Sequence, residues 1–195
     1  MPDPLPPWRA LLRGARQREV RSPQARWLQL ATVAADGTPR VRTLVFRGWG
    51  GAASLDLLTD GRSAKAEELR RQPAVELCWL LPRARCQFRL RGAVEPLPMP
   101  SSPPEQEQQQ RALQQHWLQL TPAGRALWAW PPPGEPLDPE AVFADALPPE
   151  SPRPAHFQLL RCRLEQVELL ELAGVPHRRC RWRRSHGWQE EQLNP

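Results

Sequence analysis

A hairpin signal in the first quarter of the chain constrains the fold more than any other feature. Two apolar runs, residues 27–33 and 40–47, flank the dipeptide Asp36-Gly37. Asp-Gly between such runs is a strong short-range signal for an antiparallel hairpin. Alternate residues of a strand point to opposite faces, so Arg42 shares a face with Leu44 and Phe46. An arginine among apolar neighbours needs an anionic partner.

Similar alternation recurs along the chain and predicts a mainly β protein. Further strands are expected at residues 53–58, 75–81, 86–94, 157–165, 167–172, 177–184 and 188–193. Helices are expected where Leu5, Trp8, Leu11, Leu12 and Ala15 recur at helical spacing, at residues 62–71, and at residues 105–120. Short strands in hairpin order with peripheral helices predict a closed or nearly closed antiparallel barrel.

The length of 195 residues predicts a single domain over residues 1–195, interrupted by proline-rich loops at about 96–104 and 131–154. The second loop resists regular structure except for a short helix at 139–146.

One lysine stands at a strand-to-helix turn. Lys65 is the only lysine in the chain, and the 27 cationic residues are otherwise arginine. An apolar strand ends at Asp60-Gly61, and Arg62 and Ser63 then open a helix whose free backbone N–H groups attract anions. A lysine is a compact point charge, which a planar arginine does not replace at a phosphate. The alternative interpretation is that Lys65 is a stray lysine in an arginine-rich chain.

Three segments in this order resemble a flavin-binding signature. The residues Arg42-Thr43-Leu44-Val45-Phe46-Arg47, then Thr59 through Ser63 to Lys65, then Gln87, resemble that of pyridoxamine 5'-phosphate oxidase-like proteins. The run from Val167 through His177 and Arg179 to Trp188 and Pro195 resembles the end of that family. The resemblance implies an antiparallel FMN-binding split β-barrel with peripheral helices. It also implies a homodimer with flavin at the interface.

The resemblance implies which residues hold the cofactor. The expected FMN-binding residues are Arg42, Thr43, Leu44, Val45, Arg47, Thr59, Arg62, Ser63, Lys65, Gln87 and Arg179. The phosphate calls for convergent cations and hydroxyls, which Arg42, Ser63 and Lys65 supply, with Thr59 and Arg62 as further candidates. The amide of Gln87 suits the polar edge of the flavin ring. Two alternatives require no ligand: Arg42 is a solvated strand arginine, and Ser63 is a simple helix N-cap.

The same resemblance places His177 on the substrate side as the catalytic residue, with Gln87 and Arg179 reaching the flavin held mainly by the other subunit. A neutral imidazole there could orient a substrate or accept a proton. The alternative is a turn histidine after Pro176. This sequence departs from the family in having Val175 at the position of a substrate-phosphate arginine, arginine instead of lysine at position 47, and no tyrosine. Flavin binding is therefore better supported than oxidation of pyridoxamine phosphate.

Three functions remain open at this point. The first is an FMN-dependent oxidoreductase that transfers hydride from a small substrate to the flavin. The second is a non-catalytic protein that binds or senses flavin. The third is a module that binds nucleic acid, which the net charge of +6 suggests. Its best patch, residues 178–184, has the alternation of a half-buried strand with a charged outer face, so nucleic acid is not expected as a partner.

The remaining composition argues against other classes of protein. No stretch approaches the roughly 18 apolar residues of a membrane span, and the N-terminus lacks a secretory signal pattern, which predicts a cytoplasmic location and no membrane partner. Cys78, Cys86, Cys162 and Cys180 contain no Cys-x-x-Cys pair and lie on expected strands. They are expected to be buried free thiols, not a metal or redox site.

Overall fold

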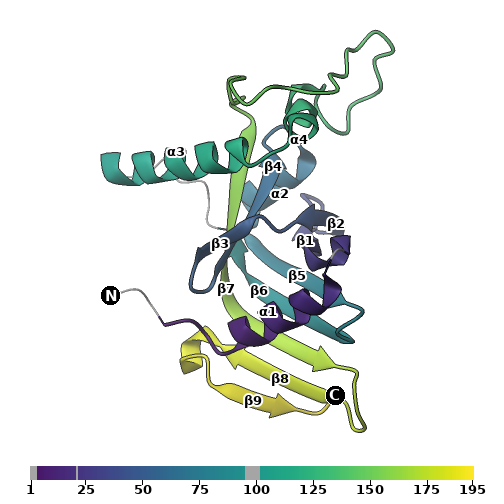
Figure 1. Cartoon of the computed structure of the whole chain (residues 1–195), viewed down its shortest axis with the longest axis vertical. Helices are drawn as coiled ribbons and strands as arrows, with labels where there is room; N and C mark the ends of the chain where they lie inside the picture. The colour runs from purple at the N-terminus through teal and green to yellow at the C-terminus, as the bar shows by residue number, and fades with distance from the viewer. Residues whose placement is uncertain (1–3, 21, 95–101) are drawn as a thin grey trace.

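The computed structural model describes residues 4–20, 22–94 and 102–195 (Figure 1). In these residues one antiparallel sheet runs in the order β2-β1-β5-β6-β7-β4-β3, and β8 and β9 continue from β7. The strands are β1 (Trp27–Val33), β2 (Pro39–Val45), β3 (Gly48–Gly51), β4 (Ser54–Asp60), β5 (Ala74–Leu81), β6 (Cys86–Val94), β7 (Phe157–Glu171), β8 (Arg178–Arg183) and β9 (Glu190–Leu193). The helices are α1 (Trp8–Glu19), α2 (Ala64–Arg71), α3 (Pro103–Leu118) and α4 (Pro122–Ala126), with short 3-10 turns at Pro23–Ala25, Leu127–Ala129 and Arg184–His186.

The hairpin predicted at Asp36-Gly37 forms as expected. β1 and β2 pair in antiparallel register from Trp27 opposite Val45 to Val33 opposite Pro39. Gly37 has a φ of 80°, which a glycine adopts without strain. The mainly β, antiparallel fold class is therefore confirmed.

The sheet of the described residues is not closed, which fits the expected split β-barrel and excludes a fully closed one. The chain leaves β2 at Val45, two residues earlier than the strand predicted at 40–47. Two single backbone bonds follow, from the Phe46 N–H to the Arg26 carbonyl (2.7 Å) and from the Arg47 N–H to the Asp56 carbonyl (2.9 Å). The end of β2 thus approaches β4, but no ladder of hydrogen bonds joins them among the described residues.

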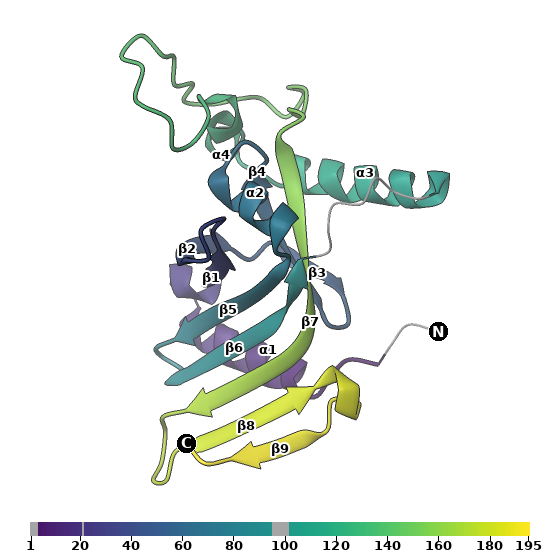
Figure 2. The same ribbon diagram turned by 180° about the vertical axis from the view of Figure 1, so that it is seen from behind.

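The central strand β7 is continuous where two strands, 157–165 and 167–172, were predicted. Figure 2 shows it running along most of the molecule, between β6 on one edge and first β4, then β8 on the other. The register against β6 shifts between Arg91 and Gly92, which face Gln166 and Leu164. This bulge inserts Glu165 as an extra residue, so the apolar alternation changes phase there and the sequence reads as two strands.

The main core lies between the sheet and α1. Trp8, Leu12 and Ala15 of α1 are buried against residues of six strands, β1, β4, β5, β6, β7 and β8. Leu11 and Leu5, which were expected on the same apolar face, are exposed instead. Trp8 packs edge-on against Trp188 and tilted against Trp49. These rings hold α1 across one face of the sheet (Figure 1).

A second, smaller core attaches α3 to the opposite side of β4 and β7. It contains Leu58 of β4, Phe157 and Leu159 of β7, and Leu113 and Trp117 of α3. Beside it, Asp56 accepts two hydrogen bonds of 2.9 Å from Arg161 and one of 3.4 Å from His116 of α3. Burial raises the pKa of Asp56, but the bonds from His116 and Arg161 outweigh it, so the pKa lies below its usual value.

Two expectations for the irregular segments also fail. Residues 139–146 form no helix. Val142 is 82% exposed, and the segment is held by Trp130, whose ring packs edge-on against Phe143 and whose indole N–H donates to the Ala144 carbonyl, and not by an apolar helix face. The final strand begins at Glu190 and not at position 188, since a 3-10 turn and Trp188 with a φ of 59° precede it. The loop predicted at about 96–104 lies largely outside the described residues, and Pro103 already begins α3.

The four cysteines lie on β5, β6, β7 and β8 and form no disulfide bond. Cys86, Cys162 and Cys180 are buried, as predicted, whereas Cys78 is half-buried. Burial raises the pKa of Cys86 and of Cys180 to about 11, so both are thiols at neutral pH. No helix in the described part of the chain is both long and apolar enough to cross a bilayer.

Candidate functional site

The turn from β4 into α2 brings together the residues predicted for a phosphate. Thr59 and Ser63 are buried, with their hydroxyl oxygens 3.4 Å apart. The Ser63 hydroxyl donates to the Asp60 carbonyl (2.7 Å) and accepts from Lys65 Nζ (2.9 Å). Ser63 occupies the N-cap position, yet its side chain caps no backbone N–H of α2. The alternative that the Ser63 side chain serves only to cap α2 therefore does not hold. The backbone N–H groups in the first turn of α2 remain able to attract an anion.

Lys65 has one hydrogen-bond partner and no ion pair among the described residues. Burial lowers its pKa, and the neighbouring Arg42 guanidinium lowers it further, while Asp60 and Glu68 oppose the shift. A half-buried cation that forms no ion pair with a carboxylate of the described residues is able to receive an external anion.

Arg42 lies on β2 beside this turn, and its anionic partner is Glu68 of α2. Arg42 NH2 and Glu68 Oε2 are 2.8 Å apart, and the same oxygen accepts from the Thr32 hydroxyl at 2.6 Å. Arg42 also donates to the Thr32 hydroxyl. The prediction that Arg42 needs an anion is confirmed, and the anion found here is a carboxylate of the chain itself.

Arg62 does not point its charge at Lys65 and Ser63. Its guanidinium is held by Asp60, with a shortest distance of 2.7 Å, and also donates to the Trp130 carbonyl at 3.0 Å. The hydrogen bond that Arg62 donates to Asp60 is the largest cause that raises the pKa of Arg62. Arg62 thus links the start of α2 to Trp130, which directly precedes the proline-rich segment 131–154.

The remaining residues of the predicted β2 segment differ in exposure. Thr43 is exposed, whereas Leu44 and Val45 are half-buried. Arg47 follows the strand, and its Nε atom is buried without a hydrogen-bond partner. Burial and the charge of Arg26 lower the pKa of Arg47. An orphaned buried donor of this kind is a position where a ligand oxygen fits.

Gln87 and Arg179 meet in a second location. They line a cavity of about 110 Å³ together with Arg89, Glu168 and Leu170. Arg179 NH2 forms an ion pair of 2.9 Å with Glu168 Oε2, which fixes the arginine at the cavity wall. The side-chain amide of Gln87 has no hydrogen-bond partner among the described residues and can donate and accept at once.

These two groups are separated within one chain. α2, which carries Ser63 and Lys65 at its start, lies at one end of the long axis of the sheet, while β8, which carries Arg179, lies toward the other end in both views (Figures 1 and 2). The structure thus brings together Arg42, Thr59, Ser63 and Lys65, and separately Gln87 and Arg179.

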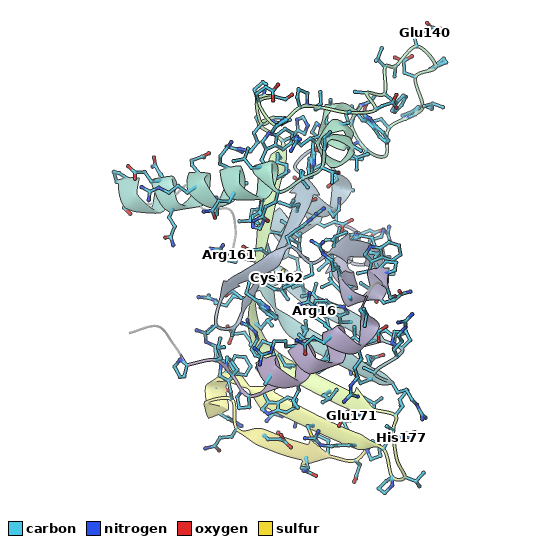
Figure 3. The ribbon with its side chains drawn as sticks, viewed as in Figure 1. Arg16, Glu140, Arg161, Cys162, Glu171 and His177 are labelled. Atoms are coloured by element: carbon cyan, nitrogen blue, oxygen red, sulfur yellow. The ribbon has the colours of Figure 1, made fainter. Side chains whose placement is uncertain are left out.

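His177 stands apart from both groups, in the turn between β7 and β8 (Figure 3). It is exposed, and its Nδ1 atom lies 3.1 Å from the Gly174 carbonyl oxygen. Within a single chain this is the environment of a turn histidine. Val175, two residues earlier, is 98% exposed.

The basic strand β8 also has a clear environment. Cys180 and Trp182 are buried, as its alternation predicted. The outward arginines have carboxylate partners, with Arg179 at 2.9 Å from Glu168 and Arg181 at 2.8 Å from Glu191. This strand therefore carries less uncompensated charge than its sequence suggests.

Sequence reasoning missed two members of the phosphate region, Glu68 and Thr32. Both are buried, and they orient Arg42 through the bonds described above. The available signal for Glu68 was its place in the helix. It lies about one turn after Lys65 and between Ala66 and Leu69, which are buried, and a glutamate at such a position needs a partner.

Comparisons with known proteins agree with this geometry. A model of the pyridoxamine 5'-phosphate oxidase FMN-binding domain matches residues 5–97. Pyridoxine/pyridoxamine 5'-phosphate oxidase 2 of Arabidopsis thaliana is 33% identical over 168 residues, which cover 85% of this chain and 83% of the relative. The pyridoxine/pyridoxamine 5'-phosphate oxidase of Salinibacter ruber is 31% identical over 99% of this chain and 89% of its own length.

Solved structures give the same result. A pyridoxamine 5'-phosphate oxidase-related, FMN binding protein from Nostoc punctiforme has a TM-score of 0.86 and 38% identity, and the match covers 99% of this chain and 100% of that one. PhzG from Burkholderia lata, solved with tetrahydrophenazine-1-carboxylic acid, has a TM-score of 0.78 at 24% identity, covering 98% and 94%, a likeness of fold alone. The matches taken together establish FMN as the cofactor of this chain.

Proposed function

Because this chain belongs to the pyridoxamine 5'-phosphate oxidase family, we propose that it is an FMN-dependent oxidoreductase acting on a small substrate. The observation that carries the proposal is Lys65, a half-buried cation with no carboxylate partner. It stands beside the hydroxyls of Thr59 and Ser63 at a helix start that no side chain caps.

The residues at this turn fit the phosphate of FMN. The phosphate carries close to two negative charges and accepts several hydrogen bonds. Lys65 supplies a mobile charge, Thr59 and Ser63 supply hydroxyls, and Arg42 supplies a guanidinium already oriented by Glu68. The orphaned Nε of Arg47 is a further donor toward the flavin. Arg62 does not contact the phosphate in this proposal. Its guanidinium is bound to Asp60 and to the Trp130 carbonyl, so its role is to hold this turn in place.

We assign the contacts with the polar edge of the flavin ring to Gln87 and Arg179 of a second copy of the chain. Both residues lie away from α2 within one chain, so they serve the same cofactor only across a homodimer interface. The dimer would also bring the exposed His177 near a flavin that its own chain does not hold. We therefore include the homodimer in the proposal.

Bound FMN supplies a two-electron hydride acceptor. The role we assign to His177 is to orient the substrate or to take up its proton through the ring nitrogen Nε2, since Nδ1 faces the Gly174 carbonyl. Val175 is apolar and exposed, so it offers no charge to a substrate phosphate. A small substrate other than pyridoxamine phosphate is therefore favoured.

Absorbance of the purified protein tests the proposal first. We expect a yellow preparation with about one FMN per chain. We also expect a mass in light scattering that corresponds to two chains. A colourless protein that does not take up added FMN contradicts the proposed cofactor site.

Turnover separates an oxidoreductase from a protein that only binds flavin. Anaerobic titration with NADPH or with a pyridoxamine compound, followed by oxygen, should give reduction of the flavin and repeated turnover. A flavin that stays oxidised with every such donor supports the second candidate, a flavin-binding or flavin-sensing protein.

A further inference from the structure

A second hollow with a positive lining lies at the start of α1, away from the proposed FMN residues. Its volume is about 330 Å³, and its wall contains three arginines, Arg9, Arg13 and Arg16, together with Trp49 and the apolar residues Leu5 and Pro7. None of the residues assigned to FMN lines it. It is concave and partly apolar, and its volume is in the range of small-ligand pockets.

The three arginines occupy one face of α1, because positions four and three residues apart in a helix point the same way. Arg9 stacks on Trp49 at 3.5 Å from the ring centroid and donates to the Ala52 carbonyl at 2.6 Å. Arg16, labelled in Figure 3, lies 4.4 Å from the centroid of Phe46. Two of the three guanidinium groups are thus fixed by neutral partners.

Arg13 stands between them on the exposed side of the helix and has no hydrogen bond among the described residues. None of the three arginines forms an ion pair in that part of the chain. The first turn of α1 also contains no acidic residue, so the positive end of the helix dipole adds to the same field.

This accumulation of charge is unfavourable without an anion. Burial lowers the pKa of Arg9 to about 10, and the charges of Arg13 and Arg16 contribute to the shift. At neutral pH all three groups remain charged, so their mutual repulsion persists. A negative ligand in the hollow would relieve it.

We propose that this pocket binds a small organic anion, a carboxylate or phosphate ester attached to an apolar ring. Arg9 and Arg16 form a rigid base for the anionic group, and the exposed Arg13 closes over it. Leu5, Pro7 and the rim of Trp49 contact the ring. Because the site is a hollow with apolar walls and not a flat stripe, a small molecule fits it better than a polyanion.

Calorimetric titration of the full chain saturated with FMN tests the pocket, since saturation keeps the phosphate region near Lys65 filled. The probes are phenyl phosphate, inorganic phosphate and phenol. We expect phenyl phosphate to bind one per chain and more tightly than inorganic phosphate, and phenol not to bind. Arg13→Gln should weaken phenyl phosphate about tenfold, as loss of a charge-assisted hydrogen bond does.

Arg18→Gln is the matched control, because Arg18 is an exposed arginine of the same helix that does not line this hollow. It changes the net charge by the same amount and should leave binding unchanged. Three outcomes overturn the proposal: phenyl phosphate does not bind, it binds equally well to Arg13→Gln, or Arg18→Gln weakens it as much as Arg13→Gln does. Equal affinity for inorganic phosphate overturns the assignment of a ring-bearing ligand. Unchanged thermal unfolding of both variants confirms that each is folded.

Discussion

Two positively charged regions of this chain are built in different ways. Around the start of α2, the cations Arg42 and Lys65 are held by a carboxylate, Glu68, and by the hydroxyls of Thr32 and Ser63. Along α1, Arg9 and Arg16 are held by aromatic rings and backbone carbonyls, with no carboxylate.

The difference lies in what fixes each cation before a ligand arrives. A carboxylate and hydroxyls set the direction of each hydrogen bond, so the region at α2 is arranged for one charged group at one place. At α1, aromatic faces and backbone carbonyls hold Arg9 and Arg16 but occupy only part of the five donors of each guanidinium, so this region keeps donors for different anions. The first suits a permanently bound cofactor and the second a ligand that comes and goes.

The largest expected effect is on FMN affinity at α2. Lys65→Ala should weaken FMN binding by about 1.5–3 kcal/mol, or roughly tenfold to 150-fold in the dissociation constant, because a charge-assisted hydrogen bond is lost. Lys65→Arg should lose less affinity but not match the native chain, since a planar fork needs different geometry. Flavin titration measures both variants. An unchanged affinity in Lys65→Ala would return Lys65 to the status of a stray surface lysine.

Removing the carboxylate would make the region at α2 resemble that at α1. Glu68→Gln should lower the free energy of unfolding by about 1–2 kcal/mol, because Arg42 and the Thr32 hydroxyl lose a charged acceptor in a mostly buried place. Urea denaturation measures this. Glu67→Gln is the matched control on the same helix. Its carboxylate is 46% exposed and pairs with Arg70 and Arg71 on the surface, so its loss should cost under about 0.5 kcal/mol. Equal losses in the two variants would show that Glu68 has no special role.

The pH dependence of FMN binding should follow Lys65. Its pKa in the free protein is lowered from 10.5 by burial and by Arg42, so the amine begins to lose its proton at lower pH than a surface lysine. The protonated form binds the phosphate, so the dissociation constant should rise severalfold, roughly, between about pH 8 and about pH 10. Lys65→Arg should remove this rise, because arginine stays charged. A rise of the same size in both proteins would assign it to another group.

The smallest effect is expected at α1 without ligand. Arg13→Gln should raise the free energy of unfolding by about 0.3 kcal/mol at low salt, because like charges four residues apart in a helix repel. High salt should abolish the gain by screening. Thermal unfolding at two salt concentrations measures it. A loss of stability in Arg13→Gln would mean that Arg13 has a stabilising contact.

Much of the fold and of the region at α2 could be predicted from the sequence, because the signals are local. Asp36-Gly37 specifies a turn, and the run from Thr59 to Lys65 specifies a strand end and a helix start. The continuity of β7 could not be predicted, because the bulge at Glu165 is visible only against its partner strand β6. The role of Glu68 depends on contact with β1 and β2, more than twenty residues away in sequence.

The arginines of α1 illustrate another limit. In sequence they have the spacing of an ordinary solvated helix face. Only the position of Trp49 on β3 and of Phe46 just after β2 shows that two of them are covered. Likewise, the short helix predicted at 139–146 has acceptable local propensity, but the segment's contact is with one residue, Trp130, and Val142 stays 82% exposed, so no apolar helix face is buried there.

The shared strand β7 has a consequence for how this chain can change in length. One strand supplies Arg161 to Asp56 at its first half and Glu168 to Arg179 at its second. A one-residue insertion between them would turn one of these two sets of side chains to the wrong face. At Gly92, opposite the bulge, an added Cβ would lie 2.0 Å from the Arg163 carbonyl oxygen, so even one methyl group is excluded there. The exposed segment 131–154 just before β7 has no such restriction. Descendants of this chain should therefore vary in length in that segment and keep the residue count of β7 constant.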